Sequence, residues 1–157
     1  MSRRPFHLFL DEHRTPVLAY LRAMVGPSDA DDCFQETFMA ALRSYETLDG
    51  KSPRAWVMAI ARNKAIDHHR SAGRRPAPRG DGLPEVAAPM PAEFDAELWA
   101  EVAALPGRQR EAVGLRFAAD LPYREISAAM DTSEEAARRN VHEGLKKLRD
   151  RVVKEER

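Results

Sequence analysis

The side chains best suited to chemistry in this 157-residue chain are basic and gather near its C-terminal end. From Ser133 past Arg149, apolar residues recur every three or four positions, at Ala137, Val141, Leu145, Leu148 and Val152, which predicts a helix with one buried face. Ser133 is a good N-cap for it. Arginines on the opposite face could each donate two hydrogen bonds to a guanine in the DNA major groove. The candidate DNA-reading residues are Glu135, Arg138, Arg139, His142 and Lys146.

A shorter helix is expected just before it, over residues 122–130, with a turn at Asp131–Ser133 between the two. Pro122 suits the first turn of a helix, because its missing N–H would have no partner there. A short helix, a three-residue turn and a longer helix with arginines on its outer face form the helix-turn-helix pattern. An amphipathic helix hairpin with a solvated basic face fits this stretch as well.

A second polar face is expected on a helix that begins with Ser28 as its N-cap and Asp31 at the capping-box position. Its buried face is expected to comprise Phe34, Phe38, Ala41, Leu42 and Tyr45. The other face is acidic and polar, so it could dock a basic partner, although an ordinary solvated face fits equally. Its candidate binding residues are Asp32, Gln35, Glu36 and Met39.

The helix expected over residues 53–70 combines amide and basic side chains with a tryptophan. Asn63 and Arg70 are seven positions apart and therefore share a face. Together with Lys64 beside Trp56, they suit single-stranded nucleic acid, through phosphate contacts and base stacking. The alternative is a basic surface around a core tryptophan, and Trp56 itself is expected in the core.

Composition and charge limit the class of protein. The chain has 25 basic and 25 acidic residues, so its formal net charge is zero. Contacts between basic side chains and phosphates supply most of a protein's non-specific affinity for DNA. We therefore expect the protein to bind DNA weakly without a partner. No apolar run approaches the roughly 20 residues of a membrane helix, and the apolar N-terminal segment is too short for a secretion signal. We therefore expect a cytoplasmic protein. Cys33, the only cysteine, is expected to be buried.

Residues 73–93 are rich in proline, glycine and alanine, lack a helical period and are interpreted as a flexible linker. Further helices are expected over residues 6–25, where Pro16 interrupts or kinks the helix, and over 94–105 and 107–119. Leu98 and Phe117 are among the apolar residues assigned to the core. The expected fold is all-α, with small helical domains at 1–72 and 94–157, each with its own core, and the helix-turn-helix in the second.

Four segments together carry a family resemblance. They read DADDCFQETFMAAL, SPRAWVMAIARNKAIDHHR, LPGRQREAVGLRF and LPYREISAAMDTSEEAARRNVHEGLKKLR. In this order, with a proline-rich linker between the second and third, they resemble the extracytoplasmic-function (ECF) group of the sigma-70 family of bacterial RNA polymerase sigma factors. The resemblance covers nearly the whole chain.

The resemblance implies a different role for each domain. The first domain would dock its acidic face on the β′ clamp helices of core RNA polymerase and capture a flipped base of the −10 promoter element. The second domain would read the −35 element and meet the β flap. An anti-sigma protein is a further implied partner, and no catalysis, cofactor, metal or membrane insertion is implied. The −10 residues would be Leu48, Lys51, Asn63, Lys64 and Arg70.

Two departures from the family pattern concern DNA contacts. Leu48 stands where the family often has an aromatic residue, so base capture is expected to differ. Glu143 stands where a basic residue is common, so it would either repel phosphates or accept a hydrogen bond from a cytosine amino group.

Two other classes of function fit the sequence less well. A free-standing helix-turn-helix regulator would leave the acidic face around Asp32 without a role. An enzyme is disfavoured because the chain has no glycine-rich phosphate loop and no nucleophile elbow. The adjacent His68 and His69 point about 100° apart on a helix and could not share a metal as an i, i+4 pair would.

Overall fold

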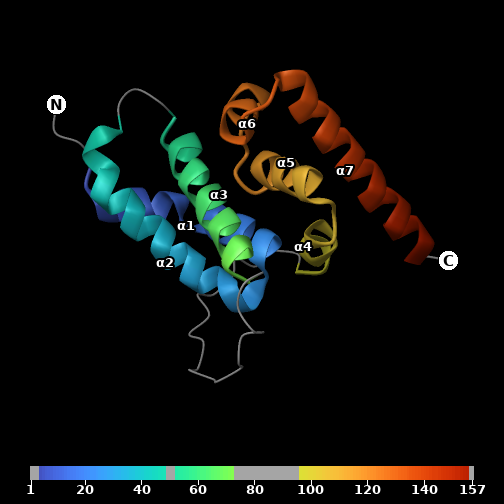
Figure 1. The fold of residues 1–157 in the computed structure, drawn as a ribbon, viewed down its shortest axis with the longest axis horizontal. Helices are drawn as coiled ribbons and strands as arrows, with labels where there is room; N and C mark the ends of the chain where they lie inside the picture. The colour runs from blue at the N-terminus through green and yellow to red at the C-terminus, as the bar shows by residue number, and fades with distance from the viewer. Residues whose placement is uncertain (1–3, 49–51, 73–95, 156–157) are drawn as a thin grey trace.

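The computed structural model of the chain describes residues 4–48, 52–72 and 96–155, and this part contains helices and no strand (Figure 1). We call residues 4–72 the first block and residues 96–155 the second block. None of the described helices is long and apolar enough to cross a membrane. The elements are α1 (Phe6–Val25), α2 (Pro27–Ser44), the short 3₁₀ helix η1 (Tyr45–Thr47), α3 (Pro53–Ala72), α4 (Ala96–Ala103), α5 (Gly107–Phe117), α6 (Tyr123–Met130) and α7 (Glu134–Glu155).

The junction between α1 and α2 follows local sequence signals, with one correction. α1 continues through Pro16 without a break, and Gly26 ends it at a positive φ of 87° that favours glycine. Pro27 then begins α2, because proline has the φ of a first helical residue and needs no donor there. The predicted N-cap at Ser28 is therefore wrong, since Gly26 occupies the N-cap position.

The first block is held together by an aromatic cluster. Phe9 is buried, and its ring packs edge-on against Phe38 and Trp56 at centroid distances of 6.4 and 5.8 Å. Such pairs add about 0.5–1.5 kcal/mol each to the burial of their area. Trp56 is partly buried against this core, as expected. Leu42 is not part of it, because the side chain is 58% exposed and lies one turn from the exposed Met39.

The second block packs α5 and α6 against α7. Val113, Ile126 and Val141 are buried between these helices. Phe117 and Leu98 were assigned to the core but are 54% and 44% exposed. α5 ends at Phe117, and a turn through Asp120, which has a φ of 55°, instead places Ala119 and Leu121 in the interior.

The two blocks share one core. α1 contacts α4 and α5, and α3 contacts α6, so the buried residues of both blocks form a single cluster. The expectation of two separate cores is wrong because α1 is apolar around almost its whole circumference between Val17 and Met24. A helix of that kind needs partners on every side. Figure 1 shows α5 and α6 beside α3, on the side toward α7.

Candidate functional site

The polar face of α7 has the predicted arrangement. The N–H of Ala136 donates to Oγ of Ser133 at 3.1 Å, so Ser133 caps the helix as expected. Ala137, Val141 and Leu148 are buried against the rest of the second block, whereas Leu145, which was expected on the same buried stripe, is 36% exposed. The five candidate DNA-reading side chains all lie exposed on the side away from this stripe, and they are Glu135, Arg138, Arg139, His142 and Lys146.

The turn before α7 fixes the angle at which this face is presented. Asp131 adopts a left-handed conformation (φ 53°, ψ 53°). Its N–H donates to the Ala128 carbonyl at 3.4 Å, and the N–H of Thr132 donates to the Ser127 carbonyl at 3.0 Å. These two bonds form a Schellman motif, which satisfies the last carbonyls of α6. The predicted helix-turn-helix is therefore present, with a turn of defined geometry.

One α6 side chain that sequence reasoning missed supports Arg138. The guanidinium carbons of Arg116 and Arg138 lie 5.0 and 5.1 Å from the centre of the Tyr123 ring. These distances suit cation–π contacts. No helical spacing rule connects positions 116, 123 and 138, because each lies on a different helix, so the sequence alone gives no signal for this stack.

The carboxylate of Glu143 accepts a hydrogen bond from another helix of the protein. Nε2 of Gln109 on α5 donates to its carboxylate at 3.3 Å. The next residue, Gly144, is buried, and a Cβ built on it would lie 2.7 Å from Cγ2 of Val113. This part of α7 therefore packs closely against α5, and Glu143 is the residue next to the close contact at Gly144.

The polar face of α2, which we call the docking face, is fully accessible. Asp32, Gln35, Glu36 and Met39 are all exposed and follow the i, i+3, i+4, i+7 spacing of one helix face. Leu42 extends the face by one further turn. An acidic rim beside two exposed apolar side chains suits a partner that offers basic and apolar groups.

The candidate −10 residues lie mainly on α3. Asn63 and Arg70 are exposed on one face, and Lys64 between them is half-buried. Leu48 is half-buried against the core after η1. Lys51 lies outside the described residues.

The histidines of α3 serve the fold of the first block. Nε2 of His68 lies 3.1 Å from the Asp29 carboxylate, and Nε2 of His69 lies 2.7 Å from the Met24 carbonyl. The two side chains therefore tie α3 to the start of α2 and to the end of α1. The described residues contain no group of three or more His, Cys, Asp or Glu that could hold a metal ion.

Cys33 is buried, as expected. Burial, followed by the nearby Glu36, Asp29 and Asp32 carboxylates, raises the pKa of its thiol to about 11. A thiol with so high a pKa is almost entirely protonated at neutral pH and therefore unreactive.

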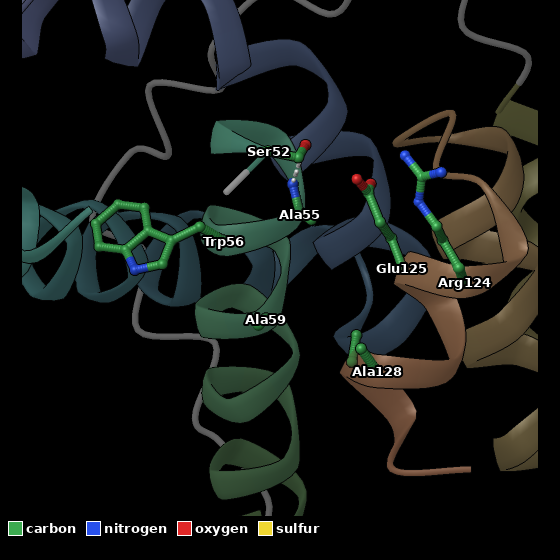
Figure 2. Close-up of a pocket in the computed structure, with 8 residues that line it drawn as sticks. Ser52, Ala55, Trp56, Ala59, Arg124, Glu125 and Ala128 are labelled. Atoms are coloured by element: carbon green, nitrogen blue, oxygen red, sulfur yellow. Dashed lines mark hydrogen bonds between the residues drawn. The ribbon is translucent and has the colours of Figure 1, made fainter. Parts of the chain in front are cut away.

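A cavity of about 490 Å³ lies between α3 and α6 (Figure 2). Figure 2 shows Ser52 and Ala55 at the start of α3, opposite Glu125 and Ala128 of α6. Trp56 projects from α3 on the side away from α6. The cavity marks a boundary between the blocks that is less tightly filled than the core beneath it.

Each block matches a known protein family. Residues 9–75 match the family Sigma-70 region 2, and residues 95–148 match Sigma-70, region 4. The chain is 33% identical over 168 residues to the ECF RNA polymerase sigma factor SigD of Mycobacterium tuberculosis, covering 97% of this chain and 79% of that protein. It is 36% identical over 137 residues to SigF of Caulobacter vibrioides, covering 85% and 76%.

Solved structures show the same fold. The sigma factor RpoE from Bartonella quintana, in complex with the anti-sigma factor NepR, superposes with a TM-score of 0.74 at 19% identity, covering 92% of this chain and 94% of that one. CnrH in complex with the cytosolic domain of CnrY gives 0.68 at 19% identity, covering 94% and 86%. With both regions present in order and relatives above 30% identity along most of the chain, the protein belongs to the ECF sigma factors of the sigma-70 family.

Proposed function

We propose that the protein is a sigma subunit that binds core RNA polymerase and directs it to promoters in the cytoplasm. The observation that carries the proposal is that one chain holds sigma-70 regions 2 and 4 in order, each with an exposed polar face. The protein supplies recognition and promoter opening, while the polymerase performs the chemistry. It is an initiation factor and has no catalytic site of its own.

Residues 1–72 form the polymerase-binding and −10 domain in this proposal, and residues 94–157 form the −35 domain. The docking face of α2 binds the β′ clamp helices, because its carboxylates complement a basic surface and Met39 adapts its shape to an apolar one. The second domain contacts the β flap. Residues 73–93 connect the two domains.

The −10 element is read by α3 and the segment before it. Extruding a base from the duplex costs a few kcal/mol, so a pocket that captures the base stabilises the separated strands. Asn63 supplies hydrogen bonds to the base edge, while Lys64 and Arg70 hold the single-stranded backbone. Leu48 and Lys51, which come from the segment before α3, contribute to the same site.

The −35 element is read by α7 in the major groove. Arg138 and Arg139 lie in its N-terminal half, which is the part of a recognition helix that reaches base edges. Glu135, His142 and Lys146 flank them along the same face. A chain with zero net charge gains little from phosphates alone, so polymerase supplies the positive field that holds the complex on DNA.

An anti-sigma protein is proposed as the inhibitory partner. Of the two solved structures named above, one holds the sigma factor RpoE in complex with the anti-sigma factor NepR, and the other holds CnrH in complex with the cytosolic domain of CnrY. A partner of this kind would cover the docking face or the DNA-reading faces and keep the sigma factor from polymerase.

Binding measurements test the proposal against a free-standing regulator. The protein, labelled at its N-terminus with a fluorophore, is titrated with sigma-free core polymerase and, separately, with promoter duplexes. A sigma factor should bind core tightly and show little sequence-specific binding to duplex alone. Specific duplex binding without any affinity for core would instead indicate a free-standing helix-turn-helix regulator.

A further inference from the structure

An acidic side chain lies at the edge of the DNA-reading face of α7. Glu143 is exposed and follows Arg139 by four residues, which places it about 40° round the helix from that arginine. Gly144 lies about a further 100° round the helix and is buried against α5. Glu143 therefore lies between the face that offers Arg139 to DNA and the side of α7 that packs on α5.

A carboxylate at this edge opposes DNA binding unless it is held away from the duplex. Duplex DNA carries one phosphate charge per about 1.7 Å of its axis, so a helix in the major groove lies close to several of them. Two like charges about 4 Å apart in water change a binding constant about fivefold, and salt screens the effect. The direction in which the Glu143 carboxylate points therefore affects the affinity of the whole face.

A glutamine of α5 holds this carboxylate. Nε2 of Gln109, in the first turn of α5, donates to Oε2 of Glu143 at 3.3 Å. A carboxylate can only accept hydrogen bonds, so the nitrogen of the amide is the end that suits it. Oε1 of Gln109 is buried. The amide therefore directs its nitrogen, and not its oxygen, at Glu143.

The backbones of α5 and α7 are in close contact beside this hydrogen bond. A Cβ built on Gly144 would lie 2.7 Å from Cγ2 of Val113 and 3.6 Å from Cβ of Gln109. Val113 is buried, so it has little room to move away. The separation of the two helices is therefore fixed at this point, and the side chain of Gln109 is long enough to reach Glu143.

We propose that Gln109 is a positioning residue for −35 recognition, and that it holds the Glu143 carboxylate against α5, away from the phosphates and the base edges. The role in recognition rests on the proposed function, whereas the contact itself is a property of the free protein. The sequence leaves two roles open for Glu143, repulsion of phosphates or a hydrogen bond from cytosine. With its carboxylate held by Gln109, Glu143 performs neither.

Nuclear magnetic resonance of the free protein tests the contact. The side-chain amide signals of Gln109 are identified by their loss in Gln109→Ala, which keeps the Cβ that packs beside Gly144. Glu143→Gln should shift these signals. Asp150→Asn is the matched control, because it removes one negative charge from an exposed residue about two turns further along the same side of α7. An equal response to both variants, or none to Glu143→Gln, would overturn the proposal.

Binding of the holoenzyme to −35 duplexes from promoters that it transcribes tests the consequence. Gln109→Ala frees the carboxylate and should lower affinity about threefold at low salt, and less at high salt. Combined with Glu143→Gln, the same substitution should change affinity by less than about 1.5-fold, because no charge remains to be released. Combined with Asp150→Asn, it should still cause the threefold loss of about the same size. Glu143→Gln alone should leave affinity within about 1.5-fold on every duplex.

Three binding results would overturn the proposal. An equal loss from Gln109→Ala with and without Glu143→Gln would show that Gln109 acts only through packing. A loss from Glu143→Gln confined to duplexes with one particular base pair would make Glu143 a base reader, and a gain on every duplex would make it a residue that repels phosphates. If the amide signals shift as expected but neither the parent protein nor any variant binds core polymerase, the proposed function and the recognition role fail, while the contact stands.

Discussion

The guanidinium carbon of Arg138 lies 5.1 Å from the centre of the Tyr123 ring, and Arg116 lies 5.0 Å from the centre of the same ring. Tyr123 is the first residue of α6, and Arg138 lies in the N-terminal half of α7. The first helix of the helix-turn-helix thus positions a side chain of the second. A guanidinium held in this way loses less conformational entropy when it binds a base.

Removing the ring should weaken −35 binding without affecting polymerase binding. Tyr123→Ala is expected to cost about 0.5–1 kcal/mol in holoenzyme affinity for a −35 fragment, because Arg138 loses its support. Arg138→Ala should cost more, about 1–3 kcal/mol, since it removes the donor itself. Fluorescence anisotropy measures both. Tyr123→Phe keeps the ring and should match the parent protein, and an equal loss in Tyr123→Phe would rule out a role for the ring.

Asn63→Ala should impair promoter opening more than initial binding. The lost edge hydrogen bonds act on an extruded base and are therefore absent from the closed complex. We expect about a tenfold lower open-complex yield by permanganate footprinting, with closed-complex affinity within about twofold. Asp67→Ala, one turn away on the same exposed face, serves as the control. If open-complex yield and closed-complex affinity fell equally, Asn63 would not act in base capture.

Reversing charge on the docking face should weaken core binding. Asp32→Lys with Glu36→Lys is expected to lower affinity for core polymerase at least about tenfold at low salt, and less at high salt. The control, Asp11→Lys with Glu46→Lys, makes the same charge change at two other exposed acidic residues. Titration by anisotropy compares them, and unchanged affinity in the first variant would overturn the docking assignment.

Gly144→Ala should destabilise the protein although alanine favours helix. The new Cβ would lie 2.7 Å from Cγ2 of Val113, a buried side chain with little rotamer freedom. Overpacking costs about 1–3 kcal/mol, which exceeds the helix gain of about 1 kcal/mol. Gly107→Ala meets no atom within 4 Å and should be neutral or stabilising. Urea unfolding at equilibrium distinguishes the two variants.

Cys33 should resist thiol reagents in the folded protein. With a pKa of about 11, only about 0.1% of the thiol is ionised at pH 8, against about 20% for a free cysteine. We expect its reaction with a disulfide reagent to be at least about a hundredfold slower in buffer than in urea, and to speed up as pH rises. Rapid modification at neutral pH would instead support a redox-sensing thiol.

Local signals in the sequence were sufficient for most of the fold. Gly26, Pro27 and Ser133 mark helix ends by backbone conformation or capping, so the helices could be placed to within a few residues. The helical period correctly placed Ala137, Val141 and Leu148 of α7 in the interior and its arginines outside, although it also assigned the exposed Leu145 to the buried stripe. It failed for Leu42 and Phe117, because an apolar residue at the margin of a stripe is buried only if another element covers it.

The contacts across the boundary between the two blocks could not be predicted from the sequence. Tyr20 packs against Gly114, 94 positions away, and Arg62 donates to Glu111, 49 positions away, so no period connects them. Arg54 and Arg62 look like ordinary surface arginines in the sequence, but both donate to backbone carbonyls of the second block. The apolar circumference of α1 between Val17 and Met24 does indicate a helix with partners on every side, but the sequence does not show which helices those partners are.

Transcription in vitro tests whether the protein directs core polymerase to promoters. The purified protein is added to sigma-free core polymerase on a pool of promoter fragments from its own genome, and the 5′ ends of the transcripts are sequenced. We expect discrete start sites that appear only with the protein, with common sequence elements near −10 and −35. If the protein neither binds core polymerase nor starts any transcript, while it still binds specific duplexes, it is not a sigma factor.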